Sequence, residues 1–300
     1  MPLPLSYPGL KCVLENLEAV KRAHIVGRSP GLQKVDKLIS LRLKDFLIHR
    51  NELIINNLMI ICDEKEVKFK MNGKTFIRQS AETQEDKMKK LINFYFCGRR
   101  VIHVDKLWWF DGLFSDFLPV DMKFRVNSLT APFLLDTAIP FIDARSFPLK
   151  TLAAVANAPI LDDPVVQSAE TLHLNLVYCR RFPVRDLKKL NNQTVVFEHC
   201  SSSRLDMDSL IKYHIETKQD IRTTFVISTS KINVIREMFS DLELAFREFQ
   251  CDLDDVYERF LPGSSRFSIP INNESRIHVY AIEDPEEDCP YKIIVKPVSR

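Results

Sequence analysis

The string Gly27-Arg28-Ser29-Pro30-Gly31 is the part of this sequence that most resembles a catalytic motif. It fits the G-x-S-x-G pattern of a nucleophile elbow, in which a serine on a strained strand-to-helix turn attacks a carbonyl carbon. An elbow needs a buried strand before the serine and an upstream loop that supplies an oxyanion-hole amide. Fewer than thirty residues precede Ser29, and their apolar spacing is mostly helical. We therefore interpret Ser29 as a helix cap and expect no enzymatic activity.

Two other groups of polar residues resemble metal sites. His199, Cys200 and His214 are accompanied by aspartates, but no pair among them has the close spacing that structural zinc sites need. The acidic run that begins at Asp252 resembles the start of a calcium loop, yet Tyr257 stands where the sharp turn requires glycine. The sequence therefore predicts neither a bound metal nor a cofactor.

Composition and charge narrow the classes of partner. The chain has 300 residues, of which 45% are hydrophobic, and its 42 basic residues nearly balance its 40 acidic ones. This balance predicts no nucleic-acid partner and no anionic membrane partner. Lys11 and Glu15 interrupt the stretch that a signal peptide would need, and no apolar run is long enough to span a bilayer. Seven scattered cysteines indicate free thiols in the cytoplasm or nucleus.

Six short, β-favouring apolar segments recur along the C-terminal two-thirds of the chain. The steps between their centres are 22, 26, 22, 22 and 30 residues, the centres being Val104, Val126, Leu152, Leu174, Val196 and Val226. Four of these five steps are typical of leucine-rich-repeat solenoids. Helix-compatible segments at residues 185–190 and 207–217 precede the last two strands, and parallel strands need such crossovers. We expect a stacked α/β solenoid whose open surface binds a macromolecule.

The remaining segments complete an expected α+β architecture of four parts. Residues 1–40 have helical apolar spacing and predict a helical module, and residues 41–80 alternate with period two and predict a small antiparallel sheet. Asn72-Gly73 in that segment is a strong hairpin signal. Residues 81–262 form the predicted leucine-rich-repeat-like solenoid, which begins with a helix near residues 82–95. Residues 263–300 alternate again and predict a C-terminal β cap over the exposed end of the solenoid.

The N-terminal helix resembles an F-box in its apolar spacing. Pro8 precedes Leu10, Val13, Leu14 and Leu17, which share one stripe. Pro8 lies closer to the first leucine than in the common F-box pattern, and the tryptophan often found near the end of that motif is absent. The strings at residues 5–11, 28–30 and 36–39 resemble the nematode F-box C family, whose members carry an F-box-associated domain of unassigned function.

This resemblance implies a partner and a function. An F-box docks onto the Skp-type linker of a cullin ubiquitin ligase, and the C-terminal domain would then recruit a protein target. The residues that we expect to contact the linker are the motif positions Pro8, Leu10, Val13, Leu14 and Leu17. A stand-alone protein-recognition solenoid without a ligase is the alternative, and a hydrolase is a distant third.

Trp108 and Trp109 belong to the densest aromatic cluster of the chain, and we include both as candidate partner-binding residues. Consecutive aromatic residues cannot all face one core, which favours exposure of at least one. The competing interpretation, burial of both between strand and helix, is the usual fate of large aromatic side chains. The neighbouring pair Arg99-Arg100 is interpreted as the solvated end of an element.

Overall fold

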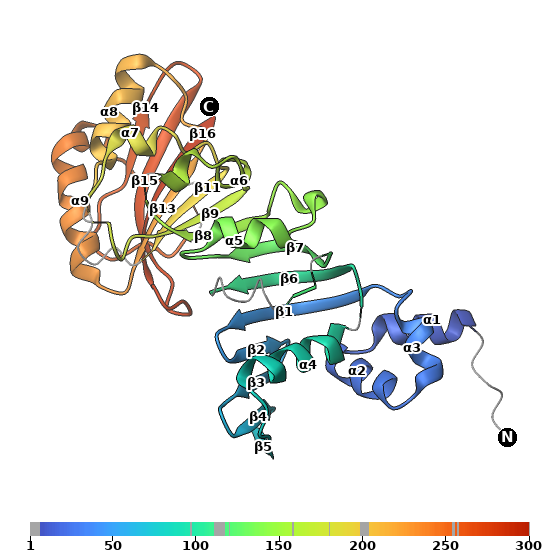
Figure 1. The fold of residues 1–300 in the computed structure, drawn as a ribbon. Helices are drawn as coiled ribbons and strands as arrows, with labels where there is room; N and C mark the ends of the chain where they lie inside the picture. Colours follow the sequence, from blue (N-terminus) through green and yellow to red (C-terminus); the bar gives the residue numbers. More distant parts are fainter. Residues whose placement is uncertain are drawn as a thin grey trace. The chain divides into compact units, whose positions relative to one another are not determined.

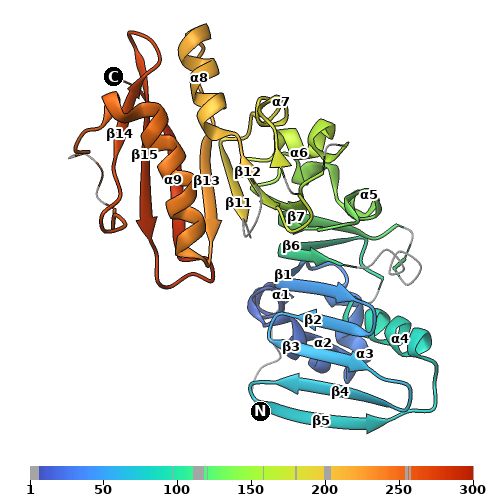
Figure 2. The ribbon, with the colours of Figure 1, turned by 90° about the vertical axis from the view of Figure 1, so that its left-hand side faces the viewer.

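The structure is a computed structural model, shown in Figures 1 and 2. It describes residues 7–96, 98–110, 118–119, 121–157, 159–179, 181–198, 204–253, 256 and 258–299. The internal contacts of the chain divide it into two compact units, Met1–Ser146 and Phe147–Arg300. Both units combine a β-sheet with helices.

Unit 1 begins with three short helices and continues into a sheet. The helices are α1 (Tyr7–Asn16), α2 (Ala19–Gly27), α3 (Pro30–Asp36) and, later in the chain, α4 (Gln84–Phe96) and α5 (Leu135–Ala138), with 3₁₀ turns η2 (Ile139–Phe141) and η3 (Ala144–Ser146). The strands are β1 (Leu41–His49), β2 (Glu52–Ile55), β3 (Leu58–Cys62), β4 (Glu66–Met71), β5 (Lys74–Gln79), β6 (Val101–Trp109) and β7 (Lys123–Thr130). Their spatial order is β7-β6-β1-β2-β3-β4-β5.

The sheet of unit 1 changes from parallel to antiparallel at β1. This strand pairs in parallel with β6 and antiparallel with β2, and the hairpins that follow extend the antiparallel part to β5. Asn72 and Gly73 both have positive φ at the turn between β4 and β5, so the predicted hairpin is confirmed. Buried residues alternate along β1, and its Phe46 packs edge-on against Phe96 of α4 at 5.1 Å between ring centroids.

Helix α4 is fixed to the sheet by a buried lysine. Lys87 is only 3% exposed, and its Nζ donates hydrogen bonds to the carbonyl oxygens of Asp63 and Glu64 at 2.7 and 2.8 Å. A buried ammonium group is tolerated where such acceptors replace water. The polar run at the start of this helix therefore includes a residue that holds it against the β3–β4 turn.

Unit 2 contains strands β8 (Thr151–Val155), β9 (Thr171–Asn175), β11 (Thr194–Glu198), β13 (Thr224–Thr229), β14 (Phe267–Pro270), β15 (Ser275–Glu283) and β16 (Tyr291–Ser299) in one sheet, and β10 (Arg181–Phe182) with β12 (Arg204–Leu205) in a two-stranded sheet. Its helices are α6 (Pro164–Ser168), α7 (Val184–Leu187), α8 (Met207–Thr217) and α9 (Ile232–Phe246), with 3₁₀ turns η4 (Pro159–Asp162) and η5 (Arg247–Phe249).

The main sheet of unit 2 is also mixed. Strands β8, β9, β11 and β13 are parallel neighbours, so the expected parallel pairing of the segments around Leu174, Val196 and Val226 is confirmed. Beyond β13 the pairing becomes antiparallel through β16, β15 and β14. Helix α9 packs against β13 and β16, as Figure 2 shows. Its buried stripe includes Ile235, Phe239 and Leu242.

The expected fold class is wrong. We expected a helical module, a separate small antiparallel sheet, a leucine-rich-repeat-like solenoid and a closing sheet. Instead, the antiparallel strands of unit 1 continue the same sheet as β6 and β7, and β16 of unit 2 extends the edge of β13. The strand spacing did not distinguish these arrangements, because crossovers connect parallel strands both in a solenoid and in a mixed sheet.

Buried Asn192 provides a test of packing in unit 2. Its Nδ2 donates to the carbonyl oxygens of Val166 and Ala169 at 2.8 and 2.7 Å, and the residue is 2% exposed. We expect Asn192→Ala to lower the free energy of unfolding by about 1–3 kcal/mol, because two buried carbonyl groups lose a donor. The measurement is urea unfolding followed by far-UV circular dichroism. Asn191→Ala is the control, since Asn191 is exposed, and equal effects of the two substitutions would contradict the prediction.

Candidate functional site

Helices α1–α3 form a small module around three buried apolar side chains. Leu14, Val26 and Ile39 make up its core, and Leu32 and Val35 pack against them in part. Ser29 occupies the N-cap position of α3 without a side-chain capping hydrogen bond. The residues around Ser29 thus form a helix start, as expected from the sequence, and the segment before it is helical.

The predicted linker-contacting residues divide between this core and the surface. Leu14 is 2% exposed, whereas the adjacent Val13 is 49% exposed. Pro8 is exposed, and Leu10 and Leu17 are half-buried. Because neighbouring residues on a helix differ by about 100° in direction, the α1 stripe is wider than its contact with the module. The Val13 side of α1 is therefore available to a partner.

Sequence reasoning missed another apolar side chain of the module. Leu38 is 76% exposed, because α3 ends at Asp36 and places it in the following turn. The helical apolar spacing of residues 1–40 did not show which of these apolar side chains are exposed. Because α3 ends before Leu38, this side chain is turned outward. The next residue, Ile39, is 2% exposed and packs in the core of the module.

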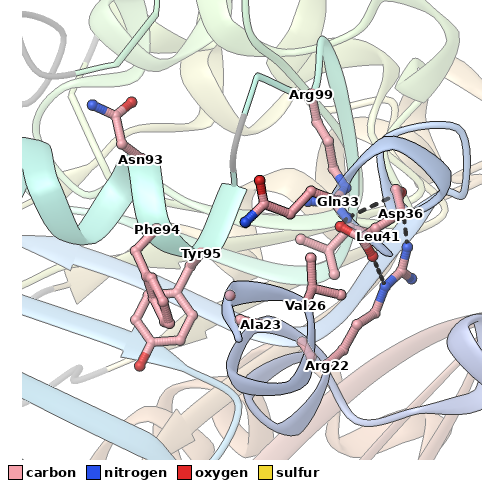
Figure 3. A pocket seen from close by; sticks show the side chains of 12 residues that line it. Arg22, Ala23, Val26, Gln33, Asp36, Leu41, Asn93, Phe94, Tyr95 and Arg99 are labelled. Atoms are coloured by element: carbon pink, nitrogen blue, oxygen red, sulfur yellow. Dashed lines mark hydrogen bonds and ion pairs between the residues drawn. The ribbon is translucent and has the colours of Figure 1, made fainter. Parts of the chain in front are cut away.

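A buried ionic cluster joins the helical module to the rest of unit 1. Arg22 of α2 donates from Nε to Asp36 Oδ1 at 2.6 Å, and Arg99 forms an ion pair with Asp36 Oδ2. Figure 3 shows the two guanidinium groups meeting at this carboxylate. Arg22 also donates to the carbonyl oxygens of Ile39 and Ser40 at 2.9 Å each. All three charged residues are at most 7% exposed.

The cluster borders a small cavity of about 180 Å³ between α2, the end of α3 and the end of α4. Phe94 and Tyr95 of α4 line one side of this cavity. The ring centroids of Phe94 and of His24 in α2 are 5.5 Å apart. A Cβ atom at Gly27 would stand 2.9 Å from Cε2 of Phe94, so α2 and α4 come very close there. The cavity is small and belongs to this packing contact.

Asp143 organises a second charged cluster in unit 1. Its Oδ2 accepts from Arg125 at 2.9 Å and from Arg145 at 3.0 Å, and Arg145 lowers the pKa of its carboxyl group most, followed by Arg125. Arg125 is the register partner of His103 on β6. Burial, together with the positive charge of Arg125 and Arg42, lowers the pKa of His103. Both arginines are thus held by one carboxylate, and the cluster connects β7 to the turn at residues 143–146.

The two tryptophans have different environments. Trp109 is fully buried, stacks on Phe141 at 5.3 Å, and donates from Nε1 to Thr137 Oγ1 at 3.1 Å. Trp108 is half-buried on the opposite face of β6. The alternation of β6 separates them, and of the pair only Trp108 offers surface to a partner.

The candidate catalytic and metal-binding residues do not assemble into a site within the described part of the chain. No group of three or more His, Cys, Asp or Glu residues with metal-binding geometry occurs there. The Nδ1 atom of His214 lies 2.7 Å from the backbone carbonyl oxygen of Gln219. Burial lowers the pKa of His214. Burial also raises the pKa of the Cys62 thiol to about 11, which removes its nucleophilic thiolate at neutral pH. His199, Cys200 and Tyr257 lie outside the described residues.

Among the described residues, no helix has the length and apolar character needed to cross a bilayer.

Comparison with known proteins gives a family match. A family model described as a domain of unknown function (DUF3557) matches residues 83–231, from just before α4 to just after β13. No curated protein and no solved structure matches the chain. The matched domain has no assigned function.

Asp36 should be essential to unit 1. We expect Asp36→Asn to destabilise the chain by about 3–5 kcal/mol, because two buried guanidinium groups would lose their carboxylate. Both tryptophans of the chain lie in unit 1, so urea unfolding followed by tryptophan fluorescence reports on this unit. The control is Glu15→Gln, which removes the exposed Lys11–Glu15 pair and should cost less than about 0.5 kcal/mol. A similar small effect of both substitutions would contradict the role of the cluster.

Asp143 should make the stability of unit 1 dependent on pH. Its pKa is lower in the folded chain than the unfolded value of about 3.9, so its contribution is complete above that value and declines as the pH falls toward the folded-state pKa. We expect Asp143→Asn to cost about 1 kcal/mol at pH 7, with the difference from wild type shrinking under acid. Tryptophan-detected unfolding across pH measures this. A difference that stays constant, or one matched by Asp105→Asn at an exposed carboxylate, would count against it.

Proposed function

We propose that this chain is a substrate-recruiting adaptor of a cullin-type ubiquitin ligase, in which α1–α3 dock onto a Skp-type linker and another surface binds a protein target. The observation that carries the proposal is the division of the α1 stripe. Leu14 fixes the helix in the module, while Val13 beside it remains 49% exposed. Burying the exposed Val13 side chain against a partner would remove apolar surface from water, which favours association.

An exposed apolar side chain and a buried ion-pair cluster of the module also support docking. Leu38 adds a second exposed apolar side chain to it, and covering this side chain with a partner would bury further apolar area. The Arg22–Asp36–Arg99 cluster ties α2 and the end of α3 to α4. A linker bound to α1 would therefore hold the sheet of unit 1 in a defined position. The F-box resemblance of the α1 spacing supports a linker of the Skp type.

The proposal includes no chemistry by the chain itself. The ligase would supply ubiquitin transfer, and this chain would supply contact with a target protein whose identity is open. It would work in the cytoplasm or nucleus, the compartments that the scattered thiols also predict. A stand-alone recognition protein without a ligase is the second candidate. An apolar groove between α2 and the β4–β5 hairpin, lined by residues such as Ile25 and Phe76, favours it because that groove needs no linker to bind a partner.

Docking can be tested by a pull-down with the Skp-type linker. We expect the wild-type chain to bind and Pro8→Ala/Val13→Asp to lose at least about thirtyfold in affinity, because burying a carboxylate in place of an apolar anchor costs about 2 kcal/mol or more. Both side chains are exposed, so the fold should survive, and tryptophan fluorescence checks this.

Leu244→Asp is the matched control for that experiment. Leu244 is 83% exposed on α9 in unit 2, so the same kind of substitution outside the module should leave linker binding unchanged. Failure of the wild-type chain to bind would make the adaptor proposal wrong and leave the stand-alone recognition protein. Equal losses in the α1 variant and in the Leu244 variant would mean that the binding does not involve α1.

A further inference from the structure

An open apolar groove lies in unit 1 between α2 and the β4–β5 hairpin. Its volume is about 980 Å³. Val20 and Ile25 of α2 form one wall, and Phe69, Met71 and Phe76 of the hairpin form the other. Ile25 is 47% exposed and Phe76 is 67% exposed. Apolar surface of this extent on an open groove is typical of a binding site.

The outer wall of the groove is a free sheet edge. Strand β5 ends the sheet of unit 1, and β4 is its one pairing partner in the described part of the chain. Every residue of β5 is exposed. An edge strand presents unpaired backbone N–H and C=O groups that can accept a further strand. An extended peptide added there would run alongside the groove.

The register of the hairpin determines which side chains face the groove. Phe76 is opposite Phe69, and Lys74 is opposite Met71. Side chains two residues apart on a strand share one face, so Lys74, Phe76 and Arg78 all point to the groove side. Phe76 therefore stands between two cations, each two residues away along the strand.

The rim of the groove is positively charged and lacks acidic residues. Lys21 of α2 adds to Lys74 and Arg78, and none of the groove residues in the described segments is Asp or Glu. None of these three side chains forms an ion pair within the part of the chain that the structure describes. Positive charge around an apolar centre is complementary to a partner with the opposite charge arrangement.

We propose that β5 binds an extended segment of a partner protein as an added strand, and that this segment has the pattern acidic–any–apolar–any–acidic. The apolar side chain would lie beside Phe76 over the groove, and the two acidic side chains would lie beside Lys74 and Arg78. Opposite charges on directly neighbouring strands stabilise pairing. The pattern reads the same in both chain directions, so it holds for parallel and antiparallel addition.

A second copy of this chain fits the edge less well. Self-pairing of β5 would bring Lys74 and Arg78 of two copies together, and the strand has no acidic residue to balance them. The inference rests on the geometry of the groove and goes beyond the adaptor proposal. The β5 site would hold whether or not α1 binds a linker, and the variants at the two sites separate the two ideas.

The test uses fluorescence anisotropy with two synthetic labelled peptides of the same composition, blocked at both ends and extended by threonines. The first has the core aspartate–threonine–isoleucine–threonine–aspartate. The second has the core threonine–aspartate–isoleucine–aspartate–threonine, which turns the acidic side chains away when the isoleucine faces the groove. We expect the first peptide to bind at least about tenfold more tightly, because only it pairs both charges on the groove face.

Charge-reversed variants complete the experiment. Lys74→Glu/Arg78→Glu should abolish binding of the first peptide and create binding of a peptide with lysines in place of the aspartates. Lys70→Glu is the matched control, because Lys70 is exposed and lies on the opposite face of the hairpin. It should leave binding within about twofold of the wild type, since an exposed charge away from the contact has little effect.

Three results would overturn the proposal: no binding of the first peptide, equal binding of the two peptides, or an equal loss in the Lys70 variant. A fourth would assign the edge to a second copy instead, namely a dimer in analytical ultracentrifugation that Lys74→Glu/Arg78→Glu dissociates. Tryptophan fluorescence of each variant confirms that unit 1 is folded.

Discussion

One carboxylate, Asp36, forms ion pairs with two guanidinium groups inside unit 1, and the placement of the helical module depends on it. Arg22 comes from α2 and Arg99 follows α4, far apart in sequence, yet both end on the same side chain with at most 7% of each residue exposed. Burying such ions is costly unless each is paired and its remaining donors are satisfied. The carbonyl oxygens of Ile39 and Ser40 supply acceptors for Arg22. The module supplies Arg22 and Asp36, and the segment after α4 supplies Arg99, so this ion-pair cluster connects the two parts.

Helix α2 contributes side chains to three features of unit 1. Val26 packs in the core of the module, Arg22 reaches the ionic cluster, and Ile25 borders the open groove. Arg22 and Val26 are four residues apart and therefore lie on nearly the same side of this nine-residue helix, whereas Ile25 is turned about 100° away from Val26. The proposed docking surface on α1 and the groove beside β5 both adjoin this helix. A partner bound at either place meets a surface whose position is fixed by buried contacts.

The local features of the sequence were sufficient to predict many elements. Period-two alternation indicated strands β1–β5, and the Asn72-Gly73 pair indicated their last hairpin. Helix-compatible segments indicated α1, α4 and α8. Each of these signals acts over a few residues, so no distant contact was needed to interpret it. The pairing of strands was different. The near-constant spacing of the later strands predicted that they are parallel, but it did not show that antiparallel strands would extend the same sheets at β1 and β13.

The sequence by itself thus determined which segments are helices and strands, where several turns lie, and that α1 has an apolar stripe. Only the tertiary structure decided which part of that stripe is covered, so that Leu14 is buried and Val13 is not. It also decided that Arg99 is buried while Arg100 beside it is solvated, and that Lys74, Phe76 and Arg78 face a groove. The physical reason is that burial and charge pairing depend on residues brought together from distant parts of the chain, whereas helix and strand periodicity are properties of neighbouring residues.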